Sequence, residues 1–167
     1  KPSTICSSYY NHGNSCFIKA LAIGRLNSVK GFDLLIEAWQ GVDAELEILG
    51  DGEDFEKLSR LIEKYKLQDR VKLIGFVENV HSHIEACDFV VVSSRREGGP
   101  LVVAEALLMQ KPIISTDVGM VEDFIPPIYV SSVENVKKLH ELIELALTNY
   151  SSLRQDFNLS FAKAEKY

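Results

Sequence analysis

Short apolar runs alternate with stretches of helical periodicity from Phe17 onward. Each run is about four to eight residues long and almost continuously apolar, which is typical of strands covered on both faces of a sheet. The runs predict strands at residues 18–24, 45–50, 71–76, 89–94, 112–116 and 128–131.

The stretches between the runs repeat apolar residues every three to four positions, which predicts amphipathic helices. Such stripes occupy residues 34–42, 55–65, 136–147 and 153–164. Strand–helix–strand alternation favours right-handed βαβ units. The expected fold class is therefore α/β: a doubly wound, Rossmann-like parallel sheet of about six strands with helices on both faces.

Residues 17–150 are expected to form this one domain, because no internal repeat or linker interrupts them. Residues 1–16 are polar and irregular, and residues 151–167 predict a C-terminal helix. The chain starts at Lys1, and we expect it to be cut from a longer protein.

Composition narrows the function classes. Among 167 residues, 18 are Lys or Arg and 24 are Asp or Glu, a formal net charge of −6. An acidic chain lacks the general electrostatic footprint of a nucleic-acid or anionic-membrane binder. Cys6, Cys16 and Cys87 form no CxxC pair and are interpreted as free, buried thiols of a cytoplasmic protein. His12 with Cys16 lacks further ligands nearby, so no metal site is predicted.

In a doubly wound sheet, ligands bind where the strand order reverses, here between the first and fourth strands. The loop after the first strand carries Arg25 and Lys30 between Gly24 and Gly31. Two cations in one short loop suit an anion such as a phosphate. The alternative is a pair of surface cations that answer nearby carboxylates.

The loop after the fourth strand holds Glu97 and leads into a helix through Gly99-Pro100. At the helix start, the amides of Leu101 and Val102 are expected to lie free for an anion. Glu105 lies on the same face of this helix as those free amides. The other residues of the stretch 101–108 are apolar on all sides, which predicts that the helix is buried all round. Its carboxylate suits a ribose diol, or alternatively a buried salt bridge. Glu97 is a candidate for the reacting end of the ligand, or a solvated loop glutamate.

Gly50-Asp51-Gly52 ends the second strand but is not a dinucleotide fingerprint, because the third glycine is missing and the strand is not the first. A nicotinamide cofactor is therefore not expected.

The ordered set of these motifs resembles the GT-B glycosyltransferases of family 4. The set comprises Gly24-Arg25-Leu26 with Lys30-Gly31, Gly50-Asp51-Gly52, Gly75-Phe76-Val77, Glu97 and Glu105 in an E-x7-E frame, Lys111-Pro112, and Gly119 with Glu122. The resemblance covers roughly residues 18–150 and implies the C-terminal, donor-binding half of such an enzyme.

The resemblance also implies roles. Gly24, Arg25 and Lys30, with the amides of Leu101 and Val102, would bind the donor diphosphate. Glu105 would hold the ribose, the backbone near Val77 would line the nucleobase pocket, and Glu97 would be the catalytic residue beside the transferred sugar. No cofactor and no metal are expected.

The implied function is transfer of a sugar, with retention, from a nucleotide-diphospho-sugar to an acceptor hydroxyl in polysaccharide, lipopolysaccharide or glycoconjugate synthesis. The acceptor, a glycan or lipid-linked glycan, would bind through an N-terminal domain outside this chain, so the chain alone is expected to be inactive. Peripheral contact of the whole enzyme with the inner face of the membrane is compatible with this. Leu153, Phe157 and Phe161 would be an exposed remnant of the contact with that domain. A GT-B-like nucleotide-sugar epimerase and a non-catalytic nucleotide-sugar-binding module are the alternatives.

Overall fold

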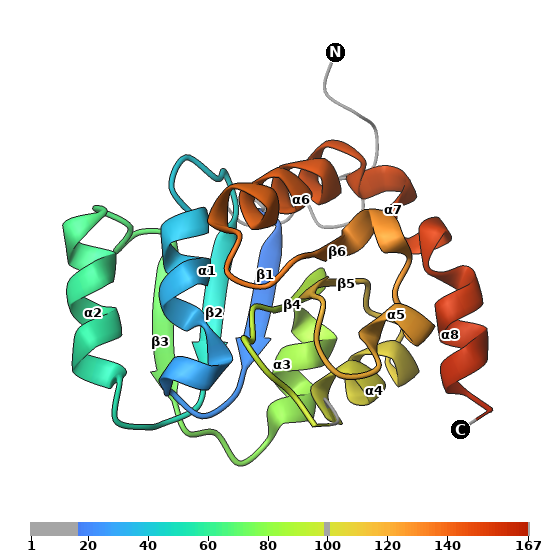
Figure 1. Cartoon of the computed structure of the whole chain (residues 1–167), viewed down its shortest axis with the longest axis horizontal. Helices are drawn as coiled ribbons and strands as arrows, with labels where there is room; N and C mark the ends of the chain where they lie inside the picture. Colours follow the sequence, from blue (N-terminus) through green and yellow to red (C-terminus); the bar gives the residue numbers. More distant parts are fainter. Residues whose placement is uncertain (1–16, 99–100, 167) are drawn as a thin grey trace, which may run out of the picture.

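The computed structural model describes residues 17–98 and 101–166. Its strands form one parallel sheet of six in the order β3-β2-β1-β4-β5-β6 (Figure 1). The strands are β1 (Lys19–Ile23), β2 (Glu45–Leu49), β3 (Val71–Gly75), β4 (Phe89–Val92), β5 (Ile113–Thr116) and β6 (Val130–Ser131). Each lies within a predicted apolar run, which confirms the predicted doubly wound sheet.

Helices cover both faces of the sheet (Figure 1). On one face α1 (Phe32–Ala38) contacts both α2 (Phe55–Lys64) and α6 (Val136–Thr148). On the other face lie α3 (Val80–Ala86) and α4 (Leu101–Leu108), and α4 contacts α8 (Asn158–Ala164). The short α5 (Val121–Phe124) also contacts α8, and α7 (Tyr150–Asp156) links α6 to α8.

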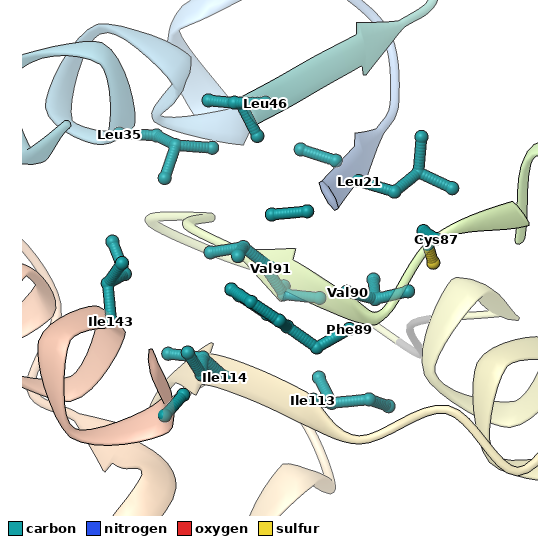
Figure 2. Packing of buried hydrophobic residues seen from close by; sticks show 14 of the residues in the cluster. Leu21, Leu35, Leu46, Cys87, Phe89, Val90, Val91, Ile113, Ile114 and Ile143 are labelled. Atoms are coloured by element: carbon teal, nitrogen blue, oxygen red, sulfur yellow. The ribbon is translucent and has the colours of Figure 1, made fainter. Parts of the chain in front are cut away.

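The central strands are buried on both faces, which explains their continuous apolar sequence. All four residues of β4 are buried. Figure 2 shows Val91 with Ile114 on the side of Ile143 from α6, whereas Val90 and Ile113 point to the opposite face. Because successive side chains of a strand point to opposite faces, one run of Val, Ile and Phe packs against the helices on both sides of the sheet.

Some elements differ from the prediction. The last strand is shorter than residues 128–131, because Pro127–Tyr129 forms a 3-10 turn before it. The first helix ends at Ala38, and Trp39 follows it with its indole N–H donating to the carbonyl of Ala44 at 3.0 Å. The helix α3 was not predicted, because Ile84 is the one buried residue among its seven and its sequence shows no apolar stripe.

The prediction of an exposed C-terminal face was wrong. Leu153, Phe157 and Phe161 are 1%, 0% and 5% exposed and belong to the core of this domain. The segment forms two helices rather than one, and the ring of Phe157 packs between those of Tyr129 and Phe161. Residues 151–164 therefore complete the α4 side of the domain; of the segment's residues, Leu159 is the large apolar side chain left exposed, at 86%.

Several predictions fall on residues outside the described ranges: the irregular segment 1–16 with Cys6, His12 and Cys16, and the helix start at Gly99-Pro100. Cys87 is buried, and burial raises the pKa of its thiol to about 12. No described helix is both long and apolar enough to cross a bilayer. Across residues 17–98 and 101–166, no three His, Cys, Asp or Glu side chains gather as metal ligands would.

Candidate functional site

The strand order reverses between β1 and β4, which pair with each other. From this pair, β2 and β3 follow toward one edge of the sheet, and β5 and β6 follow toward the other edge. The loop of residues 24–31 leaves the carboxyl end of β1, and residues 93–98 leave that of β4. Several hydrogen bonds join these loops. Among them, the amide of Arg95 donates to the carbonyl of Val29 at 2.8 Å, and the Ser93 hydroxyl donates to that of Lys30 at 2.9 Å. The two loops therefore meet at the strand-order switch, where the crevice was predicted.

Close approach of these loops depends on Gly31. Its φ is +63°, a left-handed conformation that side chains disfavour, and an added Cβ would lie 2.1 Å from the carbonyl oxygen of Ser93. Before it, Ser28–Lys30 form a 3-10 turn, η1, capped by the Asn27 side chain, which accepts from the amide of Lys30. The turn delivers Lys30 to the crevice.

Lys30 and Glu97 meet there. Lys30 Nζ lies 2.5 Å from Glu97 Oε1, and the Ser94 hydroxyl donates to the same carboxylate oxygen at 2.7 Å. The Thr116 hydroxyl at the end of β5 donates to the carbonyl of Ser94 at 2.6 Å and so fixes that loop. The side chains of Lys30 and Glu97 are 24% and 12% exposed, so their charge-assisted bond is largely shielded from solvent. The stem of Lys30 passes over Gly24, where a Cβ would lie 3.0 Å from its Cδ and Cε.

Arg25 is not joined to that pair. Its side chain is 72% exposed and its Nε lies 3.4 Å from Glu53 Oε2. Such an exposed pair contributes little to stability. A hydrogen bond from its own amide and the charge of Arg25 hold the pKa of Glu53 below its ordinary value. Arg25 thus lies on the crevice side of the sheet with its guanidinium available to solvent.

Gly50 and Gly52 form a backbone junction with the first loop, a role that sequence reasoning missed. The amide of Gly24 donates to the carbonyl of Leu49, and that of Leu26 donates to Asp51. A Cβ at Gly50 would lie 1.9 Å from the carbonyl oxygen of Gly24. A Cβ at Gly52 would likewise lie too close to backbone, 2.4 Å from the carbonyl oxygen of Leu26. A Gly-x-Gly pair directly after a strand was the available signal.

The helix α4 carries three of the predicted site residues, and burial on all its sides was a wrong prediction. Leu101 is 79% and Leu108 is 55% exposed, so one side of the helix is open. Leu101 and Val102 are its first two residues, where a helix supplies no acceptor for its own amides.

Glu105 is half-buried in α4, one turn after Leu101. Its carboxylate has no hydrogen bond or ion pair with any residue in the described part of the chain. The alternative of a structural salt bridge is therefore unsupported. The carboxylate keeps its acceptor capacity for a ligand.

Val77 follows β3 and packs partly against the core, next to Phe76, which is 78% exposed. The carbonyl of Gly75 accepts from the amide of Gly50 at 2.8 Å, so this loop adjoins the glycine junction.

Beyond β5 and β6 lies a pocket of about 480 Å³, lined by Asp117, Glu122, Pro127, Val130, Ser131 and Ser132.

Comparison with known proteins gives a consistent family. The family model described as "Glycosyl transferases group 1" matches residues 15–161. An uncharacterized glycosyltransferase of Methanocaldococcus jannaschii is 32% identical over 151 residues, which cover 87% of this chain and 42% of that protein. The poly(glycerol-phosphate) alpha-glucosyltransferase of Bacillus subtilis is 34% identical over 160 residues, which cover 89% of this chain and 24% of that protein. The chain thus spans less than half the length of these curated relatives.

Solved structures share the fold. Anabaena HepE in complex with UDP superposes with a TM-score of 0.83 at 22% identity, covering 90% of this chain and 44% of that one. The catalytic domain of the Helicobacter pylori cholesterol-alpha-glucosyltransferase superposes with a TM-score of 0.78 at 21% identity, covering 90% of this chain and 99% of that one. None of these four proteins is an epimerase, so that alternative gains no support.

Proposed function

The chain belongs to the group 1 glycosyl transferases, and we propose that it is the donor-binding half of a retaining enzyme of that family. The enzyme would transfer a hexosyl-type sugar from a nucleotide-diphospho-sugar to an acceptor hydroxyl. The observation that carries this proposal is the contact of Lys30 with Glu97 at the strand-order switch. This contact places a cation suited to binding phosphate next to a carboxylate suited to binding sugar hydroxyls.

The diphosphate would bind at Lys30, Arg25 and the first amides of α4. Breaking the sugar–phosphate bond builds negative charge on the departing nucleotide. Cations and free amides already held at that place stabilise the transition state more than the ground state. Lys30 is the better held of the two cations, because burial and Glu97 restrict it while Arg25 is mostly exposed. We propose that these groups serve without a bound metal.

The nucleoside would bind beside the diphosphate. Glu105 has a half-buried carboxylate with open acceptor positions, which suits two adjacent ribose hydroxyls. The backbone around Val77 is the proposed base pocket, and the neighbouring Phe76 offers an exposed ring. Since Anabaena HepE was solved with UDP, UDP is the first nucleotide to test.

Glu97 would act beside the transferred sugar. Its carboxylate accepts from Lys30 and Ser94 at one oxygen, Oε1. Oε2 therefore has room to accept from a sugar hydroxyl and to face the positive charge that develops on the sugar ring. An acceptor hydroxyl would then attack from the side that the diphosphate leaves, and its proton would pass to an oxygen of the departing diphosphate.

The acceptor would bind on a second domain, and this chain by itself would bind donor without transfer. Polysaccharide, lipopolysaccharide or glycoconjugate synthesis is the proposed role. A cytoplasmic site of action, with peripheral membrane contact of the whole enzyme through the second domain, completes the proposal.

Calorimetric titration of this chain with UDP, GDP and ADP tests the binding half of the proposal. We expect one of them to bind at least tenfold more tightly than its nucleoside, about the effect of one charged hydrogen bond. No binding of any diphosphate would contradict the proposal.

The catalytic half is tested by Glu97→Gln in a protein that also contains the acceptor-binding domain. Turnover should be lost while diphosphate affinity is kept or rises, because Glu97 no longer shares Lys30. Glu56→Gln, an exposed change on α2, is the matched control. Unchanged turnover in Glu97→Gln would remove Glu97 from its proposed role beside the transferred sugar.

A further inference from the structure

Arg95 binds backbone carbonyls of the turn η1. The three successive carbonyls of Ser28, Val29 and Lys30 each accept a hydrogen bond from the loop after β4. Arg95 supplies two of these bonds, from Nη1 to Ser28 at 2.7 Å and from its amide to Val29 at 2.8 Å. The hydroxyl of Ser93 supplies the third at 2.9 Å. The turn that carries Lys30 is thus held from the opposite side of the crevice.

The guanidinium of Arg95 is itself held by two carboxylates. Asp33 at the start of α1 accepts from Nη1 at 2.9 Å and from Nη2 at 3.0 Å, a two-bond contact. Glu134, after β6, accepts from Nε at 2.9 Å. Burial raises the pKa of Asp33, but hydrogen bonds and charge from Arg95 outweigh it and hold that pKa below its ordinary value. The same partners raise the pKa of Arg95.

These contacts leave Arg95 little capacity for a ligand. A guanidinium has five N–H donors. Four of them are engaged, by Ser28, by Asp33 twice and by Glu134. The side chain is 25% exposed. Arg95 is therefore built as a strut between loops, although it is a cation two residues from Glu97.

We propose that Arg95 is a positioning residue for the donor site: through Asp33 and the carbonyls of Ser28 and Val29 it holds Lys30 where the diphosphate binds. The inference rests on the proposed function. It assigns to Arg95 and Asp33 an effect on ligand affinity that acts through Lys30 and not by contact with the ligand.

Asp33→Asn separates this role from direct phosphate binding, because the two predict opposite signs. If Arg95 bound the phosphate itself, removing the charge of Asp33 would free the guanidinium and tighten binding. If Arg95 positions Lys30, the same change loosens the strut and weakens binding by several-fold. Affinity for the nucleoside diphosphate is measured by calorimetry well below the melting temperature of each variant, with the nucleoside alone as reference.

A double-mutant cycle tests the route through Lys30. Arg95→Ala should weaken diphosphate binding about tenfold, as for one lost charged hydrogen bond, and leave nucleoside binding within about twofold. In a Lys30→Ala background, Arg95→Ala should have no further effect. Arg95→Lys should not restore affinity, because an ammonium cannot make the two-bond contact with Asp33. Arg96→Ala, an exposed neighbour with the same change of charge, is the control and should bind as the parent chain does.

Three results would overturn the inference while the proposed function stood: tighter binding by Asp33→Asn, full rescue by Arg95→Lys, or additive losses for Arg95→Ala and Lys30→Ala. Failure of the parent chain to bind any diphosphate would instead overturn the proposed function, and this inference with it.

Discussion

Lys30 and Glu97 are 67 positions apart in the sequence, yet Lys30 Nζ lies 2.5 Å from Glu97 Oε1. The bond spans the two loops that leave β1 and β4, so it joins the two sides of the strand-order switch. Glu97 holds the charge of Lys30 at this point, and the two side chains keep 24% and 12% of their surface exposed. The relationship makes Lys30 the most constrained cation of the proposed diphosphate site.

Replacing Lys30 is therefore expected to cost diphosphate affinity specifically. Lys30→Ala should weaken binding of the nucleoside diphosphate about tenfold or more, since one charged hydrogen bond is lost. Binding of the nucleoside should change little. Isothermal titration of both ligands measures the difference, with the exposed Lys64→Ala on α2 as the charge-matched control. Equal losses for nucleoside and diphosphate would remove Lys30 from the phosphate site.

Glu105 is expected to act on the ribose alone. Glu105→Ala should lower the affinity for a ribonucleoside diphosphate by roughly 1.5–3 kcal/mol, the scale of a charged hydrogen bond. With the 2′-deoxynucleoside diphosphate, one of the two accepted hydroxyls is absent, so the same substitution should cost clearly less. The comparison needs four titrations, of two proteins with two ligands. An equal cost with both ligands would place Glu105 away from the ribose.

The glycine junction predicts a matched pair of stability effects. Gly50 and Gly41 both have positive φ, at +134° and +80°, but only at Gly50 would a Cβ meet backbone, 1.9 Å from the oxygen of Gly24. Gly41→Ala should cost about 1–2 kcal/mol from left-handed strain alone. Gly50→Ala should cost more, because the loops after β1 and β2 must separate. Urea denaturation measures both free energies of unfolding, and equal costs would contradict the close approach.

Acid is expected to lower the free energy of unfolding through Glu47, which lies on β2. Burial raises the pKa of Glu47, but hydrogen bonds and charge from Lys19 and His83 outweigh it and hold the pKa below its ordinary 4.5. A carboxyl with a lowered folded pKa stabilises the fold above its unfolded pKa, and that contribution is lost as the pH falls through the folded value.

The Glu47→Gln variant tests this linkage. Between about pH 6 and pH 3, the parent should lose more stability than Glu47→Gln, so the difference between them narrows in acid. Denaturation midpoints across this range give the measurement. The exposed Glu141→Gln on α6 should follow the parent curve, since its contact with Lys138 is a surface pair at 3.5 Å. A gap that stays constant with pH would contradict the assigned partners.

Much of the architecture was legible in the sequence because it depends on local pattern. The strands β4 and β5 are buried on both sides, and each longer helix shows an apolar stripe. The order of elements and the switch between β1 and β4 followed from this pattern. The loops holding Lys30 and Glu97 could then be placed at one edge. Two predictions failed for one reason: the helices at residues 101–108 and 153–164 show where apolar residues are but not what covers them.

The sequence by itself determined the α/β class, the strand-order switch and the residue types in the two loops beside it, because hydrophobic period and turn chemistry act over a few neighbouring residues. Only the tertiary structure decided that Lys30 pairs with Glu97, that Arg25 lies apart with Glu53, and that Arg95 braces the turn η1. Contacts between residues so distant in sequence arise from how loops approach once the sheet has formed, and no local pattern encodes that approach.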